Sequence, residues 1–207
     1  TTYGALGALG FGIGTSEIEH LLATQTLVYR KLKTLRVSVK GELPFGCSAK
    51  DIVLELLERT GADGATGYAI EFDGETISAL SVEGRMTLCN MAVEAGARGA
   101  IIAPDAKVFD YIYGKPQMPS GELWQLALQE WSQLSSDADA VFDKTVTIDC
   151  LDLEPKVTWG ISPDQTCAIT GYIPSPEHET HPLKRLALEK ALQYMDLLPG
   201  TPVSDIR

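Results

Sequence analysis

Residues 85–104, RMTLCNMAVEAGARGAIIAP, join a run of helix-forming residues to a short apolar run. The first part predicts a helix built from small and apolar residues, and its last six residues, GAIIAP, predict a buried β-strand. Within the helix, Asn90 and Glu94 are four positions apart and therefore project from one face. Because an unpaired amide or carboxylate is costly to bury, their place on a largely apolar helix needs an explanation.

The segments that precede this stretch extend the alternation of strand and helix. Residues 34–40, TLRVSVK, alternate apolar and polar side chains, which predicts a half-buried strand. Ser48 and Asp51 predict the N-cap of a helix that Gly61 ends, and residues 68–72, YAIEF, predict the next strand. Strands and helices that alternate along a chain predict an α/β fold, with helices packed on a sheet.

The remaining elements are predicted from local signals. Ser16 and Glu19 form a capping-box pattern, which predicts a helix that runs to about Tyr29. Residues 75–81, ETISALS, are interpreted as a short strand or an extended entry to the helix that follows. A connection rich in proline and glycine at 115–120 indicates a domain boundary. Further helices are expected at 105–114, 122–134 and 183–198, and strand and extended chain at 145–160.

Composition excludes two classes of function. The 207 residues carry a formal net charge of −11, whereas nucleic-acid binding needs a basic footprint. No apolar run reaches 18 residues, so no membrane span is expected. The start, TTYGALGALG, lacks the basic region of a signal peptide, and a mature protein or a piece of a longer one can begin this way. One basic cluster is interpreted as a helix end that leads into a strand with a solvated face; it comprises Arg30, Lys31, Lys33, Arg36 and Lys40.

The cysteines, histidines and glycine-rich turn are weaker candidates for chemistry. Without a CxxC pair, the cysteines indicate free thiols in a reducing cytoplasm, or in the plastid stroma if the source is a plant or alga. The glycines of residues 61–67 suggest a phosphate cradle, but no Lys-Ser/Thr pair follows them. The histidines show no metal-ligand spacing and stay unassigned. These residues are Cys47, Cys89, Cys150, Cys167, His20, His178 and His181.

Four stretches together resemble the aconitase family, and within it the large subunits of isopropylmalate isomerases. They are GALGFGIGTSEIEHLLATQTL (7–27), GRMTLCNMAVEAGA (84–97), PKVTWGISPDQ (155–165) and ALQYMDLLPGTPVSDI (191–206). The resemblance covers essentially the whole chain. The turn at 64–67 reads Gly-Ala-Thr-Gly where the family has Gly-Gly-Thr-Gly, a difference of one methyl group.

The resemblance implies a fold and a set of site residues. The expected fold is a three-layer α/β/α aconitase-type domain over residues 1–118. A connecting helix and the start of the following α/β domain are expected over 119–207. In the family, the residues that match Asn90 and Glu94 face the iron–sulfur cluster and the substrate. Glu94 is therefore expected to be catalytic, and Asn90 to bind substrate.

The same resemblance implies that the metal ligands lie elsewhere. A four-iron cluster of this class is held by three cysteine thiolates, which leaves one iron open. The family supplies them from a Cys-Thr-Asn motif and a CxxC, both expected downstream of Arg207, and has an Asp-Ser-His-Thr motif expected directly before Thr1. The 4Fe–4S cluster is thus expected in the intact enzyme, with no metal ligand in this chain and no cluster bound to it. The chain alone is expected to be inactive.

The implied activity is a hydro-lyase reaction of leucine biosynthesis. It interconverts 2-isopropylmalate and 3-isopropylmalate by dehydration and rehydration, and the expected partners are a separate small subunit and the hydroxy-acid substrate. Two alternatives stay open: a homoaconitase-type enzyme that acts on a longer acid, and a non-catalytic fragment that only binds the small subunit. Trp159, within VTWGISP, is interpreted as a packing residue on a loop near the substrate cleft.

Overall fold

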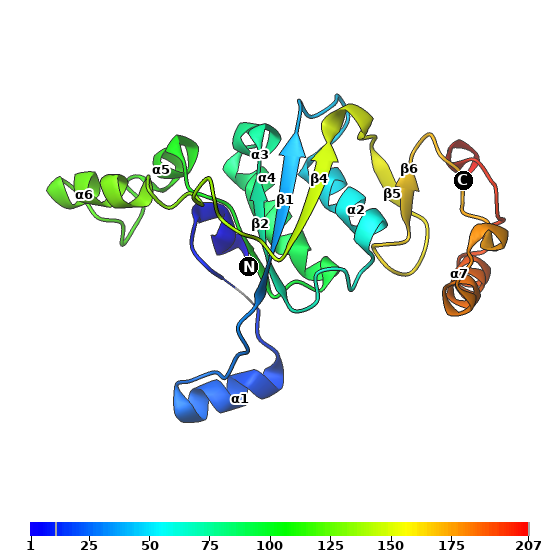
Figure 1. The fold of residues 1–207 in the computed structure, drawn as a ribbon, viewed down its shortest axis with the longest axis horizontal. Coiled ribbons are helices and arrows are strands. Elements are labelled where there is room, and N and C mark those ends of the chain that lie inside the picture. The colour runs from blue at the N-terminus through cyan, green and yellow to red at the C-terminus, as the bar shows by residue number, and fades with distance from the viewer. Residues whose placement is uncertain (11, 207) are drawn as a thin grey trace.

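The computed structural model describes residues 1–10 and 12–206 and confirms the α/β class (Figure 1). Its centre is a parallel four-stranded sheet in the order β3-β2-β1-β4. Two short strands, β5 and β6, form an antiparallel pair beside it. The strands are β1 (Lys33–Lys40), β2 (Tyr68–Asp73), β3 (Gly99–Ile101), β4 (Lys144–Asp149), β5 (Lys156–Thr158) and β6 (Thr166–Ala168).

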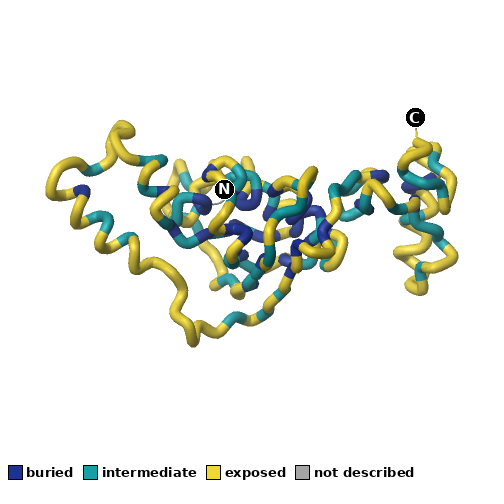
Figure 2. The backbone as a smooth tube through the Cα atoms, turned by 90° about the horizontal axis from the view of Figure 1, so that it is seen from above, coloured by how far each residue is buried: buried dark blue, intermediate teal, exposed yellow. Residues whose placement is uncertain are grey.

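The helices alternate with the strands in the first half of the chain. The α-helices are α1 (Thr15–Thr24), α2 (Ala49–Thr60), α3 (Glu75–Ala79), α4 (Val82–Met91), α5 (Ala106–Ile112), α6 (Glu122–Trp131) and α7 (Pro182–Met195). Single 3-10 turns are η1 (Thr2–Leu6), η2 (Ala92–Ala95), η3 (Cys150–Asp152), η4 (Pro176–His178) and η5 (Val203–Asp205). Burial is concentrated around the sheet, while α6 and α7 lie at opposite ends of the molecule and are mostly exposed (Figure 2).

The alternation in β1 separates the two faces of the sheet. Leu35, Val37 and Val39 are fully buried and belong to the hydrophobic core that α2 and α4 share. Arg36 points to the other face, where its guanidinium lies 5.5 Å from the centre of the Phe142 ring. Side chains of residues 134–143 therefore contact this second face, and Figure 1 shows that segment running from α6 to β4.

The start of α2 confirms the predicted N-cap at Ser48, which forms a capping box with Asp51. Asp51 Oδ2 accepts hydrogen bonds from the backbone N–H of Ser48 at 2.7 Å and from its hydroxyl at 2.8 Å. Its second oxygen, Oδ1, accepts from the backbone N–H of Lys156 at 2.8 Å. One carboxylate thus starts the helix and also ties β5 to it.

Three local predictions were wrong. Helix α1 begins at Thr15, and its capping pair is Gly14 and Glu17 in place of the predicted Ser16 and Glu19. The Glu17 carboxylate accepts a hydrogen bond from the backbone N–H of Gly14 at 2.7 Å. It also ends at Thr24, since Gln25 adopts a left-handed conformation with φ of 57°. Residues 75–79, expected to be extended, form α3 instead.

The hydrophobic residues form two separate clusters. The larger one runs from Ala5 to Leu153 and includes strand β4, which follows the expected boundary at 115–120 and pairs with β1. The smaller one joins the β5–β6 pair to α7, through Trp159, Cys167, Ile173, Ala191 and Leu192. We therefore propose that the division between structural units lies near residue 155, where one cluster gives way to the other.

Candidate functional site

The candidate site is a cleft of about 680 Å³ on the outer side of the helical layer. One wall comes from α2, α4 and η2, the opposite wall from residues 158–163, and Thr2 lies at one side. Asn90 and Glu94 both line it. The structure therefore brings the two predicted site residues to one wall of one cleft.

Asn90 and Glu94 are exposed, which answers the question that the sequence raises. Asn90 lies in the last turn of α4, and Glu94 lies in η2, where the α-helix tightens to a 3-10 turn. The opposite face of the same segment is fully buried and consists of Leu88, Cys89, Ala92 and Ala95. The segment is thus buried on one side only, and its polar pair faces the cleft. On Asn90, Oδ1 accepts a hydrogen bond from the Thr1 hydroxyl at 3.2 Å.

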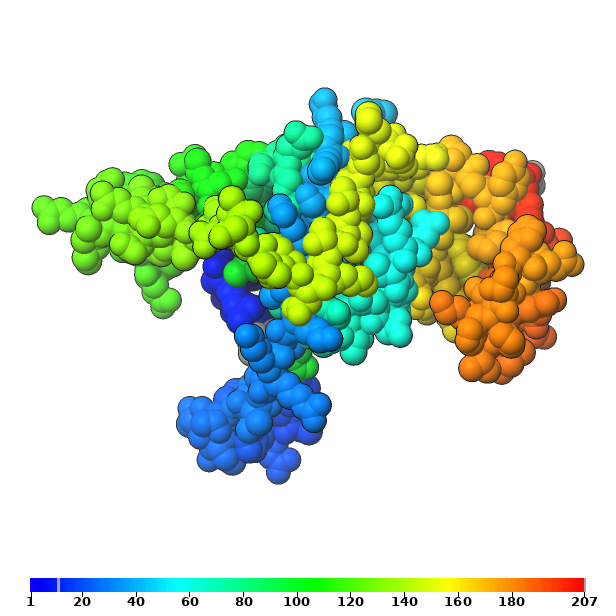
Figure 3. Space-filling model, in the orientation of Figure 1, coloured from blue at the N-terminus to red at the C-terminus, as the bar shows by residue number. Residues whose placement is uncertain are grey.

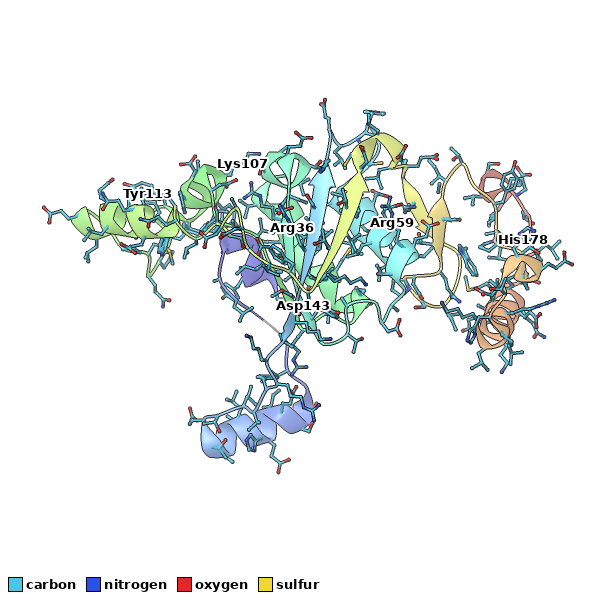
Figure 4. The ribbon with its side chains drawn as sticks, viewed as in Figure 1. Arg36, Arg59, Lys107, Tyr113, Asp143 and His178 are labelled. Atoms are coloured by element: carbon cyan, nitrogen blue, oxygen red, sulfur yellow. The ribbon has the colours of Figure 1, made fainter. Side chains whose placement is uncertain are left out.

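The ion pair between Arg85 and Asp105, which the sequence analysis did not predict, anchors α4 to the residue that precedes α5. The fully buried Arg85 donates to both oxygens of Asp105, at 2.9 and 2.6 Å, and to the carbonyl of Ser78 at 3.0 Å. Burial alone would raise the pKa of Asp105, but the hydrogen bonds from Arg85 outweigh it and lower that pKa. Lys107 donates to the carbonyls of Ser78 and Ala79, which secures the end of α3 (Figure 4).

A second cluster of charges attaches the opposite wall of the cleft, residues 158–163, to α2. The Lys156 side chain is only 6% exposed, and its ammonium lies 2.6 Å from Glu55 and also pairs with Glu58. Together with Asp51, these carboxylates occupy one face of α2. Burial would lower the pKa of Lys156 and raise that of Glu55, but their mutual hydrogen bonds outweigh burial and have the opposite effect on both. The pairs attach β5, and with it the cleft loop, to α2.

The cleft loop keeps its shape through Gln165. Its side-chain oxygen accepts hydrogen bonds from the backbone N–H groups of Ile161 at 2.7 Å and Ser162 at 3.2 Å. A Cβ atom at Gly160 would lie 2.1 Å from this oxygen, so a side chain there would displace it. Trp159 itself is buried in the smaller hydrophobic cluster, while its neighbour Thr158 lines the cleft. The packing role expected for Trp159 is therefore confirmed.

The chemistry of the lining is mixed. Among the described residues that line the cleft, Lys50 carries the one positive charge and Glu94 the one negative charge. Leu54, Met86 and Ile161 add apolar surface. The cleft can therefore offer an ammonium, an amide and a carboxylate to a small polar molecule, and apolar contacts to its alkyl part.

The other sequence candidates lie away from the cleft. His20 is exposed on α1, which projects from the body (Figures 1 and 3). His178 is exposed beside α7 (Figure 4), and His181 is exposed at the N-cap of that helix. Within residues 1–10 and 12–206, no three His, Cys, Asp or Glu side chains gather as a metal site. The histidines remain without an assigned role.

The cysteines do not fit an iron–sulfur cluster. Cys89 and Cys150 are buried in the larger hydrophobic cluster, Cys167 lies in the smaller one, and burial raises the pKa of Cys89 to about 12. A four-iron cluster needs three thiolates around one centre, which these positions do not provide. The described cysteines therefore do not form the ligand set of an iron–sulfur cluster.

No helix in the described part of the chain has the length and apolar character that a membrane crossing needs.

Comparison with known proteins identifies the family. The aconitase family (aconitate hydratase) matches residues 1–207. Over all 207 residues the chain is 86% identical to "3-isopropylmalate dehydratase large subunit 2" of Salmonella choleraesuis (strain SC-B67). It is 62% identical to "3-isopropylmalate dehydratase large subunit 1" of Mannheimia succiniciproducens. The chain spans 44% of the length of each of these relatives. Since the family match covers every residue, the chain belongs to the aconitase family.

Proposed function

We propose that this chain is part of the large subunit of a 3-isopropylmalate dehydratase. The observation that carries the proposal is the shared position of Asn90 and Glu94 on one wall of the cleft. The 86% identity to a large subunit of that name supports it. The intact enzyme would be a hydro-lyase that interconverts 2-isopropylmalate and 3-isopropylmalate.

The two residues have complementary roles in this proposal. The reaction removes a hydroxyl from one carbon and a proton from its neighbour, and then returns water with the positions exchanged. The Asn90 amide would hold a substrate oxygen without adding charge. In the dehydration, the acid form of Glu94 would donate a proton to the hydroxyl, which then leaves as water, and in the rehydration its carboxylate would take a proton from the water that returns. The proton of the neighbouring carbon would pass to a base elsewhere in the intact enzyme.

The partners of the intact enzyme are also proposals. The name "large subunit" of the relatives supports a small-subunit partner, and family membership supports a 4Fe–4S cluster held by cysteines outside residues 1–207. The cytoplasm is proposed as the compartment, because all four thiols are free.

The test is an assay of the full-length large subunit, combined with its small subunit and an intact cluster. We expect turnover of 2-isopropylmalate and 3-isopropylmalate, and at least tenfold lower kcat/KM on an acid whose chain is longer by one carbon. The Salmonella large subunit in the same assay is the positive control. No turnover of either isomer would disprove the proposal, and a preference for the longer acid would indicate a homoaconitase-type enzyme.

A further inference from the structure

We propose that Thr1 is a positioning residue, whose hydroxyl orients the Asn90 amide so that its NH₂ group faces the substrate. This inference rests on the proposed function, because it assigns the direction in which Asn90 binds. Thr1 itself is not counted among the residues that line the cleft. It therefore acts through Asn90 and not by contact with the substrate.

The orientation follows from one hydrogen bond. The Thr1 hydroxyl oxygen lies 3.2 Å from Asn90 Oδ1, and since an amide oxygen only accepts, the hydroxyl is the donor. In the described residues, the Asn90 side chain has no other hydrogen bond to protein. With its oxygen directed to Thr1, the amide has two N–H donors left for the cleft.

The position of Thr1 is set by tight packing. The backbone N–H of Gly4 donates to the carbonyl of Thr1 at 3.1 Å, and the carbonyl of Gly4 accepts from Ile102 at 3.0 Å. A Cβ atom on Gly4 would lie 1.8 Å from the carbonyl oxygen of Ala100, so only glycine allows this approach. The turn η1 is thus fixed against β3, and it holds the Thr1 hydroxyl over the end of α4.

The fixed amide defines which ligand groups the wall accepts. Asn90 offers donors, and the carboxylate oxygens of Glu94, four residues on, offer acceptors. A ligand that presents a carboxylate oxygen beside a hydroxyl satisfies both, and a hydroxy acid has these groups on the same or neighbouring carbons. With the amide reversed, its oxygen would face the ligand carboxylate, which would repel it.

The experiment compares Thr1→Val and Thr1→Ser in the full-length large subunit with its small subunit. Valine matches the shape of threonine without the hydroxyl, whereas serine keeps the donor. We expect Thr1→Val to raise KM for isopropylmalate roughly 3- to 10-fold, the range for loss of one neutral hydrogen bond, and Thr1→Ser to stay near wild type. Thr145→Val is the control, because Thr145 is exposed on β4 and its hydroxyl makes no hydrogen bond to the described residues.

A double variant separates positioning from mere packing. If Thr1 acts through the amide, Thr1→Val has no further effect on KM in an Asn90→Ala background. The inference would be overturned if the effects of Thr1→Val and Asn90→Ala on KM multiply in the double variant. An unchanged KM in Thr1→Val alone would also overturn it. Its failure is distinct from failure of the proposed function, because turnover of isopropylmalate by the unmodified enzyme decides the latter.

Discussion

Lys156 and Glu55 form an ion pair of 2.6 Å in which the lysine side chain is 6% exposed and the glutamate 14%. Loss of either partner leaves a buried charge without compensation. We expect Lys156→Met to lower the free energy of unfolding by about 3 kcal/mol, measured by urea denaturation. Arg185→Met is the matched control, because the Arg185–Glu189 pair is half-exposed and should contribute less than about 1 kcal/mol. Equal losses in both variants would contradict the importance of the buried pair.

The paired carboxylates of Glu55 and Asp105 predict that the stability of the fold decreases in acid. The pKa values of Glu55 and Asp105 are lowered from their ordinary values of 4.5 and 3.8, so both groups bind protons more weakly in the folded state. Their stabilisation is complete well above pH 4.5 and is lost as pH falls through the lowered values. Urea midpoints between pH 7 and pH 3 should fall mainly below pH 4.5. Arg85→Lys should weaken this pH dependence, and an unchanged pH profile in that variant would count against a contribution from the Arg85–Asp105 pair.

Glu94 is the residue on which the proposed chemistry depends. In the full-length enzyme we expect Glu94→Gln to reduce kcat by roughly two to four orders of magnitude, the range for a positioned acid–base group. Glutamine keeps the volume, so the urea midpoint and the iron content should not change. Glu83→Gln, at an exposed position on the preceding helix α4, serves as the control. Near-normal turnover of Glu94→Gln would leave Glu94 a surface residue without a part in the reaction.

Lys50 is the one cation among the described residues of the cleft wall, and a carboxylate substrate needs such a charge. We expect Lys50→Gln to raise KM about tenfold while kcat changes little, and Lys50→Arg to retain most of the affinity. Lys190→Gln, on the exposed side of α7, controls for loss of one surface charge. Equal KM values for the two glutamine variants would place the substrate carboxylates elsewhere.

The thiols should differ in their reaction with alkylating reagents. Cys47 is partly exposed, while Cys89, Cys150 and Cys167 are buried. At pH 8 we expect one thiol per chain to react in the native state and four in urea, counted by mass spectrometry. The reaction of Cys47 should itself be slow, because burial raises its pKa. A Cys47→Ser variant should then show no native reaction, and rapid labelling of Cys89 would contradict its burial.

Signals close together in the sequence predicted the fold well. The capping residues Ser48 and Asp51 lie three positions apart, and the alternation around Val37 marks the buried face of β1 directly. The end of α1 was missed, because Gln25 adopts a left-handed conformation that glycine more often supplies. Local pattern therefore identified the start of α2 and the buried face of β1, but neither the start nor the end of α1.

The candidate site was predictable only in part. Spacing alone puts Asn90 and Glu94 on one face, and the structure keeps them together although the helix changes type between them. The contacts that hold the walls of the cleft join residues far apart in the chain: Thr1 lies 89 residues before Asn90, and the Lys156 backbone is 105 residues beyond Asp51. No local pattern marks such pairs, because only the packed fold brings them within hydrogen-bonding distance.

The place of β1 in the middle of the sheet has a consequence for synthesis on the ribosome. Thr34, at the start of β1, bonds to Asp143 beside β4, 109 residues further along the chain. At roughly 5–20 residues per second, one edge of β1 therefore waits about 5 to 20 seconds for its neighbour. An open strand edge is a template for wrong pairing, and charged side chains discourage it. Lys33, Arg36 and Lys40 place three positive charges along that strand, which disfavours its pairing with the same strand of a second chain before β4 emerges.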